Sequence, residues 1–169
     1  GVHTLPDRSK YVGQHKKGQR HGKGTEILKN GEKYSGNWKD GTREGKGIYT
    51  WPSGSKYVGE FKNWDLNGHG TFSFPDGGKY VGEFKDGEHH GIGVHTESDG
   101  DRYQGQWKNG MPHGKGIHTQ TNNVVYEGNW LKGSKHGQGI YTMKDLGEYE
   151  GQWRNSDMEG QGTLTFHNG

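Results

Sequence analysis

The residues of this chain with the most obvious capacity for chemistry are its 11 histidines. Four of them stand directly before a Gly-x-Gly pattern and are separated by multiples of 23 residues: His21, His90, His113 and His136. In a β-structure with one hairpin per interval, equivalent histidines lie two strands apart, or about 9.6 Å. Two imidazoles that share one zinc ion each place a nitrogen about 2.0–2.1 Å from the metal. We therefore predict no metal site and interpret these histidines as surface or turn residues.

The other residue types used in catalysis form no known constellation. The chain has no cysteine, and no serine stands in a Gly-x-Ser-x-Gly element. Its Gly-x-Gly patterns recur at a fixed interval, whereas a phosphate-binding loop stands once between a strand and a helix. Carboxylates are scattered over polar positions. We predict that this segment is not an enzyme and holds no cofactor.

A row of cations is a further candidate for binding. At one position of the 23-residue interval the chain carries Lys16, Lys39, Lys62, Lys85, Lys108 and Arg154. Leu131 interrupts the row, and Asp40 and Asp86 directly follow two of its lysines. Because each charge near an anionic membrane surface contributes about 1 kcal/mol, phospholipid binding is one hypothesis. A solvated edge of the fold is the alternative.

Charge and composition exclude several classes of protein. Lys plus Arg total 22 and Asp plus Glu total 20, so the net charge of +2 is too small for a nucleic-acid-binding surface. No apolar run is long enough for a membrane-spanning helix, and the N-terminus lacks the apolar core of a signal peptide. The absence of cysteine agrees with a reducing compartment, and we expect a cytoplasmic protein.

The unusual composition of the chain is explained by an internal repeat. Only 24% of residues are hydrophobic and 34 are glycine, values that favour disorder, but 12% are aromatic, which is too many for a solvated tail. Seven blocks of 23 residues each begin with a tyrosine: Tyr11, Tyr34, Tyr57, Tyr80, Tyr103, Tyr126 and Tyr149. The third, twelfth and fourteenth positions of every block are glycine, and the fifth is aromatic except at His15. The repeat rules out disorder.

The pattern Tyr-x-Gly-x-Trp/Phe-x-x-Gly-x-x-x-Gly-x-Gly resembles the MORN repeat family. The resemblance covers residues 11–169 as seven repeats, and residues 1–10 fit the last ten positions of a preceding repeat, with Gly1 in a glycine column. We therefore expect a section of a longer array. The resemblance implies an extended sheet with an aromatic-lined groove. It also implies a role as a protein-binding scaffold, associated in some members with the cytoskeleton or membranes, or as the targeting segment of a longer enzyme.

Each block is typical of a β-hairpin, with a strand of alternating type, a turn rich in Gly, Asn and Asp, and a second strand with β-branched residues. We predict an all-β fold, an elongated single-layer antiparallel sheet of tandem hairpins. The first, third and fifth positions share one face, where rings lie over glycines. Trp64 and Ser156 replace the turn glycine at the eighth position, and we expect only local changes there. At the twenty-first position Asn123 tolerates left-handed geometry, and Gly147 substitutes for the glycine that Leu146 replaces.

The aromatic columns are the principal candidate for function. A single layer cannot cover both sides of its rings, so we expect a partly exposed aromatic strip that binds a helix or an extended segment of another protein. The sixteenth and eighteenth positions, apolar near both ends of the array and polar in the middle, would supply specificity. A homodimer is a further expectation, because the sheet has open edges. The expected groove residues are Tyr34, Trp38, Tyr49, Trp51, Tyr57, Phe61, Phe72, Phe74, Tyr80, Phe84, Tyr103, Trp107, Tyr126, Trp130, Tyr141, Tyr149 and Trp153.

Overall fold

The computed structural model describes residues 2–4 and 9–167 of the chain. The described residues form fifteen β-strands and no helix, and the chain divides into two compact units, residues 1–88 and 89–169. Within each unit every strand pairs with its neighbours in chain order, and all of these pairings are antiparallel. The predicted all-β architecture of tandem hairpins is confirmed.

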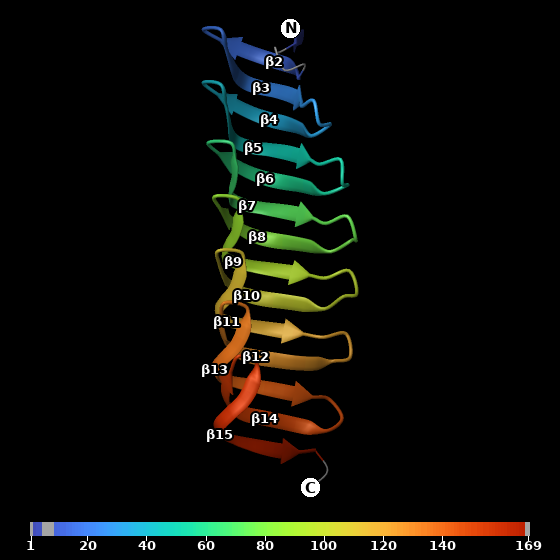
Figure 1. Cartoon of the computed structure of the whole chain (residues 1–169), viewed down its shortest axis with the longest axis vertical. Coiled ribbons are helices and arrows are strands. Elements are labelled where there is room, and N and C mark those ends of the chain that lie inside the picture. Colours follow the sequence, from blue (N-terminus) through green and yellow to red (C-terminus); the bar gives the residue numbers. More distant parts are fainter. Residues whose placement is uncertain (1, 5–8, 168–169) are drawn as a thin grey trace. The chain divides into compact units, whose positions relative to one another are not determined.

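The strands of both units follow the 23-residue repeat, with two strands per repeat (Figure 1). In the first unit they are β1 (Val2–Thr4), β2 (Lys10–Lys16), β3 (Gln19–Ile27), β4 (Lys33–Lys39), β5 (Thr42–Thr50), β6 (Lys56–Lys62), β7 (Asp65–Ser73) and β8 (Lys79–Lys85). In the second they are β9 (Glu88–Thr96), β10 (Arg102–Lys108), β11 (Met111–Thr119), β12 (Val124–Leu131), β13 (Ser134–Met143), β14 (Gly147–Arg154) and β15 (Asp157–Phe166).

Strand β1 pairs with β2 in the same register in which the second strand of a later repeat pairs with the first strand of the next repeat. Val2 of β1 lies opposite Val12 of β2, as Thr25 lies opposite Ser35 two strands further on. Gly1, which the sequence pattern places in a glycine column, lies outside the described residues.

The turn inside each hairpin contains two residues with positive φ. Asn109 and Gly110, at the seventh and eighth positions of their repeat, have φ of 50° and 76°. This pair of left-handed residues is the type I′ turn, whose twist matches that of the flanking strands. The twelfth-position glycine also has positive φ. Two residues before it, a backbone carbonyl accepts a hydrogen bond from the hairpin turn of the next repeat. For example, the Gly41 N–H donates to the Arg20 carbonyl at 2.9 Å. Consecutive repeats are therefore joined by these tips as well as by strand pairing.

The turns between repeats agree with their predicted geometry. Asn123 has φ of 61°, the left-handed conformation expected of it in place of glycine. Leu146 has no positive φ, and its neighbour Gly147 has φ of 146°. Both substitutions are accommodated locally and the strand pairing continues on either side.

The core of each repeat is a tyrosine ring that lies over two facing glycines. In the fifth repeat Gly105 of β10 pairs with Gly116 of β11, and a Cβ added at Gly116 would lie 2.3 Å from the Tyr103 hydroxyl oxygen. That hydroxyl donates a hydrogen bond to the Gln106 carbonyl at 3.0 Å. The same bond, from the first position to the carbonyl of the fourth, is present in all seven repeats. The predicted packing of aromatic rings on strand glycines is confirmed.

The fifth-position rings join these cores edge to face. Tyr34 contacts Trp38 of its own repeat and Phe61 of the next, with ring centroids 5.2 and 4.9 Å apart. The Trp38 indole N–H donates to the Gly24 carbonyl at 3.2 Å, and the other three fifth-position tryptophans donate to the equivalent glycine carbonyl. Edge-to-face pairs stabilise by about 0.5–1.5 kcal/mol beyond the area they bury.

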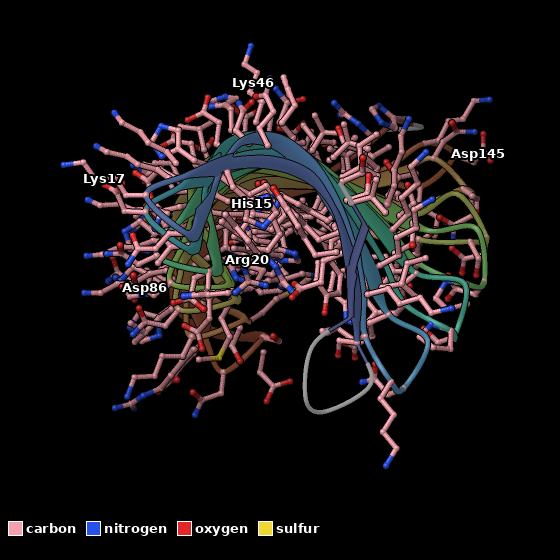
Figure 2. The ribbon with its side chains drawn as sticks, turned by 90° about the horizontal axis from the view of Figure 1, so that it is seen from above. His15, Lys17, Arg20, Lys46, Asp86 and Asp145 are labelled. Atoms are coloured by element: carbon pink, nitrogen blue, oxygen red, sulfur yellow. The ribbon has the colours of Figure 1, made fainter. Side chains whose placement is uncertain are left out.

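The expected exposure of these rings is wrong. Tyr34 and Tyr57 are 0% exposed and Trp38 is 2% exposed, and every aromatic residue of the first and fifth positions is buried. The strands curve (Figure 2), and the rings contact those of the next repeat. In four repeats a tenth-position side chain also contacts them: Arg20, Arg43, His89 and Lys135. A single layer therefore buries its first- and fifth-position rings after all.

The curvature gives the first unit two different faces. The inner face carries the tyrosine rings, and the outer face carries the side chains that alternate with them along each strand. Seen end-on, His15 and Arg20 lie inside the curve and Lys46 points away from it (Figure 2). We use the same two names for the equivalent faces of the second unit.

Replacement of a core glycine is expected to destabilise the chain strongly. A Cβ at Gly105 would lie 2.5 Å from the Gly116 Cα and 2.5 Å from the Lys115 carbonyl oxygen, both of them backbone atoms. We expect Gly105→Ala to lower the free energy of unfolding by about 3 kcal/mol. Urea titration followed by tryptophan fluorescence measures the change.

The matched control is Gly110, which has positive φ but no atom near an added Cβ. Gly110→Ala should cost about 1–2 kcal/mol, from left-handed geometry alone. Equal losses for the two variants would show that the facing glycines are not required for packing.

Candidate functional site

A row of partly exposed aromatic residues on the inner face of the first unit lies at the sixteenth and eighteenth positions of its repeats. Trp51, Phe72 and Phe74 are partly exposed, and they continue from the buried Tyr49. Successive ring centroids along this row are 4.5, 5.3 and 4.8 Å apart. We call these four residues the aromatic shelf. Its residues Trp51, Phe72 and Phe74 are the part of the predicted groove that remains accessible in the first unit.

Beside the shelf lies an ion cluster that the sequence analysis missed. The Glu26 carboxylate is 3% exposed and accepts hydrogen bonds from Arg20 and from Arg43, the latter at 2.9 Å. Arg20 also donates to the Gly41 carbonyl at 3.2 Å. Two guanidinium groups thus share one buried carboxylate, and the cluster carries one net positive charge. The arginines occupy the tenth position of successive repeats, which local pattern alone does not mark as special.

The arginines are stacked on aromatic rings. The Arg20 Cζ atom lies 4.3 Å from the centroid of Trp38, and the Arg43 Cζ atom lies 4.7 Å from that of Tyr49. Both Cζ atoms lie 5.1 Å from the centroid of Trp64. Cation–π contacts of partly buried arginine contribute from about 0.5 to 2 kcal/mol each. The rings therefore hold the guanidinium planes in fixed positions.

Trp64 breaks a local rule of the repeat. It occupies the eighth position, which is glycine in five of the other six repeats, and it has φ of 80°. Left-handed backbone in a bulky residue costs about 1–3 kcal/mol. Its ring packs edge to face on Trp38, with centroids 5.7 Å apart, yet the residue is 40% exposed. The sequence predicts only a local change in the turn at this position, and the structure adds the contacts of the Trp64 ring with Trp38 and the two arginines.

One further contact fixes the shelf. The Tyr49 hydroxyl donates a hydrogen bond to the Glu32 carboxylate. Burial and this hydrogen bond raise the pKa of Tyr49 to about 12, although Arg43 opposes the shift. The phenol is therefore protonated at neutral pH and remains a donor to Glu32.

The second unit fills the tenth position differently. The Lys135 ammonium lies 5.0 Å from the ring centroid of Tyr126, 4.5 Å from that of Tyr141 and 5.1 Å from that of Trp153. Burial lowers its pKa. A cation of the chain itself thus occupies this aromatic cage, and Tyr141, one of the predicted groove residues, contacts that cation.

Histidines occupy the inner face at the start of the second unit. The His89 ring contacts Trp107 edge to face, with centroids 5.2 Å apart, and its centroid lies 6.5 Å from that of His95. Burial is the larger and the charge of His95 the smaller of two causes that together lower the pKa of His89 to about 4. Over residues 2–4 and 9–167, no three His, Asp or Glu side chains gather closely enough to hold a metal ion.

The predicted cation row lies on the outer face next to the hairpin tips. Lys16, Lys39, Lys62, Lys85 and Lys108 are all exposed, and so is Arg154, which pairs with Glu159 at 3.0 Å. Leu131, which interrupts the row, is 41% exposed. None of the described segments is a helix of the length and apolarity needed to cross a membrane.

These features define a class of protein, the tandem-hairpin repeat proteins, in which tyrosine rings pack on facing glycines. The family model of the MORN repeat matches the chain seven times, over residues 11–33, 34–56, 57–79, 80–102, 103–124, 126–147 and 149–169. The chain belongs to the MORN repeat family. Repeats of this family are generally modules for interaction with proteins or membranes.

Comparison with solved structures returned low similarity scores. The TCP domain of Drosophila melanogaster SAS-4 (dCPAP), solved in complex with a proline-rich motif of Ana2 (dSTIL), is 12% identical, with a TM-score of 0.47 over 97% of this chain and 88% of that chain. Virginiamycin B lyase from Staphylococcus aureus is 12% identical, with a TM-score of 0.20 over 99% of this chain and 55% of the lyase. No curated protein matched the sequence.

Loss of the shared carboxylate should destabilise the first unit. Without Glu26, the side chain of Arg43, which is 8% exposed, keeps a buried charge with no counter-ion. We expect Glu26→Ala to cost about 3–5 kcal/mol of unfolding free energy in a urea titration. Glu159→Ala, which breaks the exposed pair with Arg154, should cost less than about 1 kcal/mol. Similar losses would contradict the buried character of the cluster.

Stability should fall on acidification because of His89. The unfolded chain takes up this proton near pH 6.5, whereas the folded chain does so near pH 4. The contribution of neutral His89 is therefore complete above pH 6.5 and is lost between pH 6.5 and 4. His89→Leu, which introduces the residue that Leu66 provides in the third repeat, should remove this part of the pH dependence. Thermal unfolding measured every half pH unit tests it, and an unchanged profile would exclude His89 as the cause.

Proposed function

We propose that this chain is a non-catalytic, cytoplasmic scaffold whose first unit binds a partner protein on its inner face. The binding surface consists of the exposed Trp64, the adjacent arginine cluster and the aromatic shelf. The occupant is a helix or an extended segment that runs along the concave side. An association with the cytoskeleton belongs to the same proposal and is supported only by the family resemblance.

The single observation that carries this proposal is the conformation of Trp64. A tryptophan in left-handed backbone, where the repeat otherwise favours glycine, costs stability and still leaves 40% of the residue exposed. Strained residues of this kind persist only where the surrounding structure holds them in place, and they cluster at binding sites. Trp64 is fixed between Arg20 and Arg43 before any partner arrives, so little side-chain entropy remains to be lost on binding.

The composition of the surface supports the same conclusion. Tryptophan, tyrosine and arginine are the residue types most enriched among those that dominate binding energies at interfaces. Here all three types lie together with two phenylalanines of the shelf, and the polar contacts of Glu26 and Glu32 hold them in place. By contrast, the first- and fifth-position rings are buried, so they support the surface and do not form it.

A second candidate function is binding to an anionic membrane surface through the sixth-position cations. The specific observation in its favour is that the five lysines of this row are exposed and form no ion pair in the described part of the chain. The adjacent Asp40 and Asp86 reduce the net charge at two of these tips. We therefore rank this candidate below the inner face.

Trp64→Gly separates binding from folding. Glycine is the residue of Gly41 and Gly87 at the same position, so the variant loses the anchor and relieves the turn. The partner, isolated on the immobilised wild-type chain and identified by mass spectrometry, should bind Trp64→Gly at least about 30-fold more weakly, which corresponds to a loss of about 2 kcal/mol. Surface plasmon resonance measures both affinities.

The control variant is Val81→Ala on the outer face, because Val81 is 41% exposed and thus matches Trp64 in accessibility. It should bind as the wild type does. Wild-type affinity in Trp64→Gly, or equal losses in both variants with unchanged thermal stability, would exclude the inner face as the binding surface.

A further inference from the structure

The outer face of the first unit contains a groove that the proposed function does not use. The groove has a volume of about 750 Å³ and extends across strands β2 to β7. Its floor is the bare backbone of the glycines at the third and fourteenth positions: Gly24, Gly36, Gly47 and Gly59. The same glycines receive the tyrosine rings on the inner face, so the feature that builds the core also hollows the opposite face.

One wall of the groove is aliphatic. Val12, Ile48 and Val58 line it and are 50%, 40% and 43% exposed. Ile48 and Val58 are directly opposite each other on β5 and β6. Thr25 and Ser35 continue this wall between Val12 and Ile48. The wall therefore contains no charge.

The other wall carries a net positive charge, from Lys23 and Lys46 against Glu60, which lies directly opposite Lys46 on β6. Lys23, Lys46 and His69 occupy the thirteenth position of successive repeats and line the groove, with Glu60 as the one carboxylate among the lining residues described. Lys23 and Lys46 are exposed and form no ion pair with any described residue. In Figure 2 the Lys46 side chain extends outward from the crest of the curve.

A second row of lysines flanks the aliphatic wall on its far side. Lys10, Lys33, Lys56 and Lys79 are exposed and alternate across the strands with Ile27, Thr50 and Ser73. None of these seven residues is acidic. An uncharged wall beside the row of Lys23 and Lys46 favours an occupant with one apolar side and one negatively charged side, and the second lysine row adds to the attraction for an acidic occupant.

The second unit has the same groove with a different charge. Its volume is about 470 Å³, and Glu127 and Glu150 line it at the position where the first unit has Val12 and Val58. At the position of the flanking lysines the second unit has Arg102, Val125 and Glu148. The cationic, aliphatic character of the first groove is therefore not a general consequence of the repeat.

We propose that the outer groove of the first unit binds an acidic peptide in the polyproline II conformation. Cations at the thirteenth position recur every two strands, at about 9.6 Å. A polyproline II helix has three residues per turn and rises about 3.1 Å per residue, so every third side chain lies on one side at about 9.3 Å. A carboxylate at every third position would face Lys23 and Lys46 in turn, with apolar residues against Val12, Ile48 and Val58. Same-side residues of a β-strand are about 6.8 Å apart and would not match.

A flat lipid surface fits this site less well. The floor is recessed between two walls, so a membrane would touch the protruding lysines and leave the glycine backbone uncovered. An extended peptide instead reaches the floor along the whole length of the groove. The proposal is independent of the inner face, and the two can fail separately.

The test uses the whole chain and a fluorescein-labelled peptide, four repeats of Glu-Pro-Val, in fluorescence anisotropy titrations. We expect saturable binding that weakens at least tenfold with Lys23→Glu plus Lys46→Glu. Lys115→Glu, the same position in the second unit, and Trp64→Gly on the inner face should leave the affinity unchanged. The substituted lysines are exposed, so each variant should fold, and circular dichroism checks this.

Control peptides test the chemistry of the two walls. Replacement of Glu by Lys should abolish binding, and an alternating Glu-Val peptide of equal length should bind at least tenfold more weakly because its spacing does not match. Absence of saturable binding, or equal affinity in the double lysine variant, would overturn the proposal. Sedimentation with phosphatidylserine vesicles that depends on Lys23 and Lys46, without peptide binding, would likewise replace it with a membrane site.

Discussion

The contact of one tyrosine ring with two facing glycines is the constraint on which the rest of the structure depends. A Cβ at either glycine would meet the ring or the opposite backbone at about 2.2 to 2.8 Å, so no other residue fits without displacement of the strands. The tyrosine hydroxyl is satisfied by a carbonyl of its own strand. Because the ring covers backbone and not side chains, a single layer of sheet can bury an aromatic core without a second layer. Edge-to-face contacts between consecutive repeats then continue that core through each unit.

The contact between tyrosine and the two glycines determines which positions of the repeat are buried in the core and which remain available for binding. The first and fifth positions are used up in the core, so their tyrosine and tryptophan side chains are not available for binding. The positions that vary between repeats are those left over on either face. On the inner face these include the tenth position, where Arg43 and Lys135 carry their charges into aromatic surroundings. On the outer face they decide whether the groove over the glycines is cationic, as at Lys46, or acidic, as at Glu127.

Two features of the first unit, the backbone of Trp64 and the buried Glu26 carboxylate, each cost folding stability. Trp64 adopts a backbone conformation suited to glycine, and Glu26 is a buried carboxylate that requires two arginines to compensate for its lost hydration. Neither feature is needed to build the repeat, since five other repeats have glycine at the position of Trp64 and no other repeat has a carboxylate at the position of Glu26. Both features fix the orientation of neighbouring groups, the exposed indole ring and the largely buried guanidinium planes. Sites that violate local preferences in this way are where sequence-level reasoning is expected to fail.

The sequence by itself determined the period, the hairpins, the glycine ladder and the left-handed turns, because these depend on residues within one repeat. Asn123 and Gly147 are examples in which backbone preference alone gave the correct geometry. Only the tertiary structure decided which aromatic rings are buried, because strand curvature and the tenth position of adjacent repeats cover them. The cluster of Arg20, Glu26 and Arg43 likewise joins two strands of different repeats, and no local pattern reveals it. Burial and ion pairing depend on neighbours across strands, and these exist only after the sheet has formed.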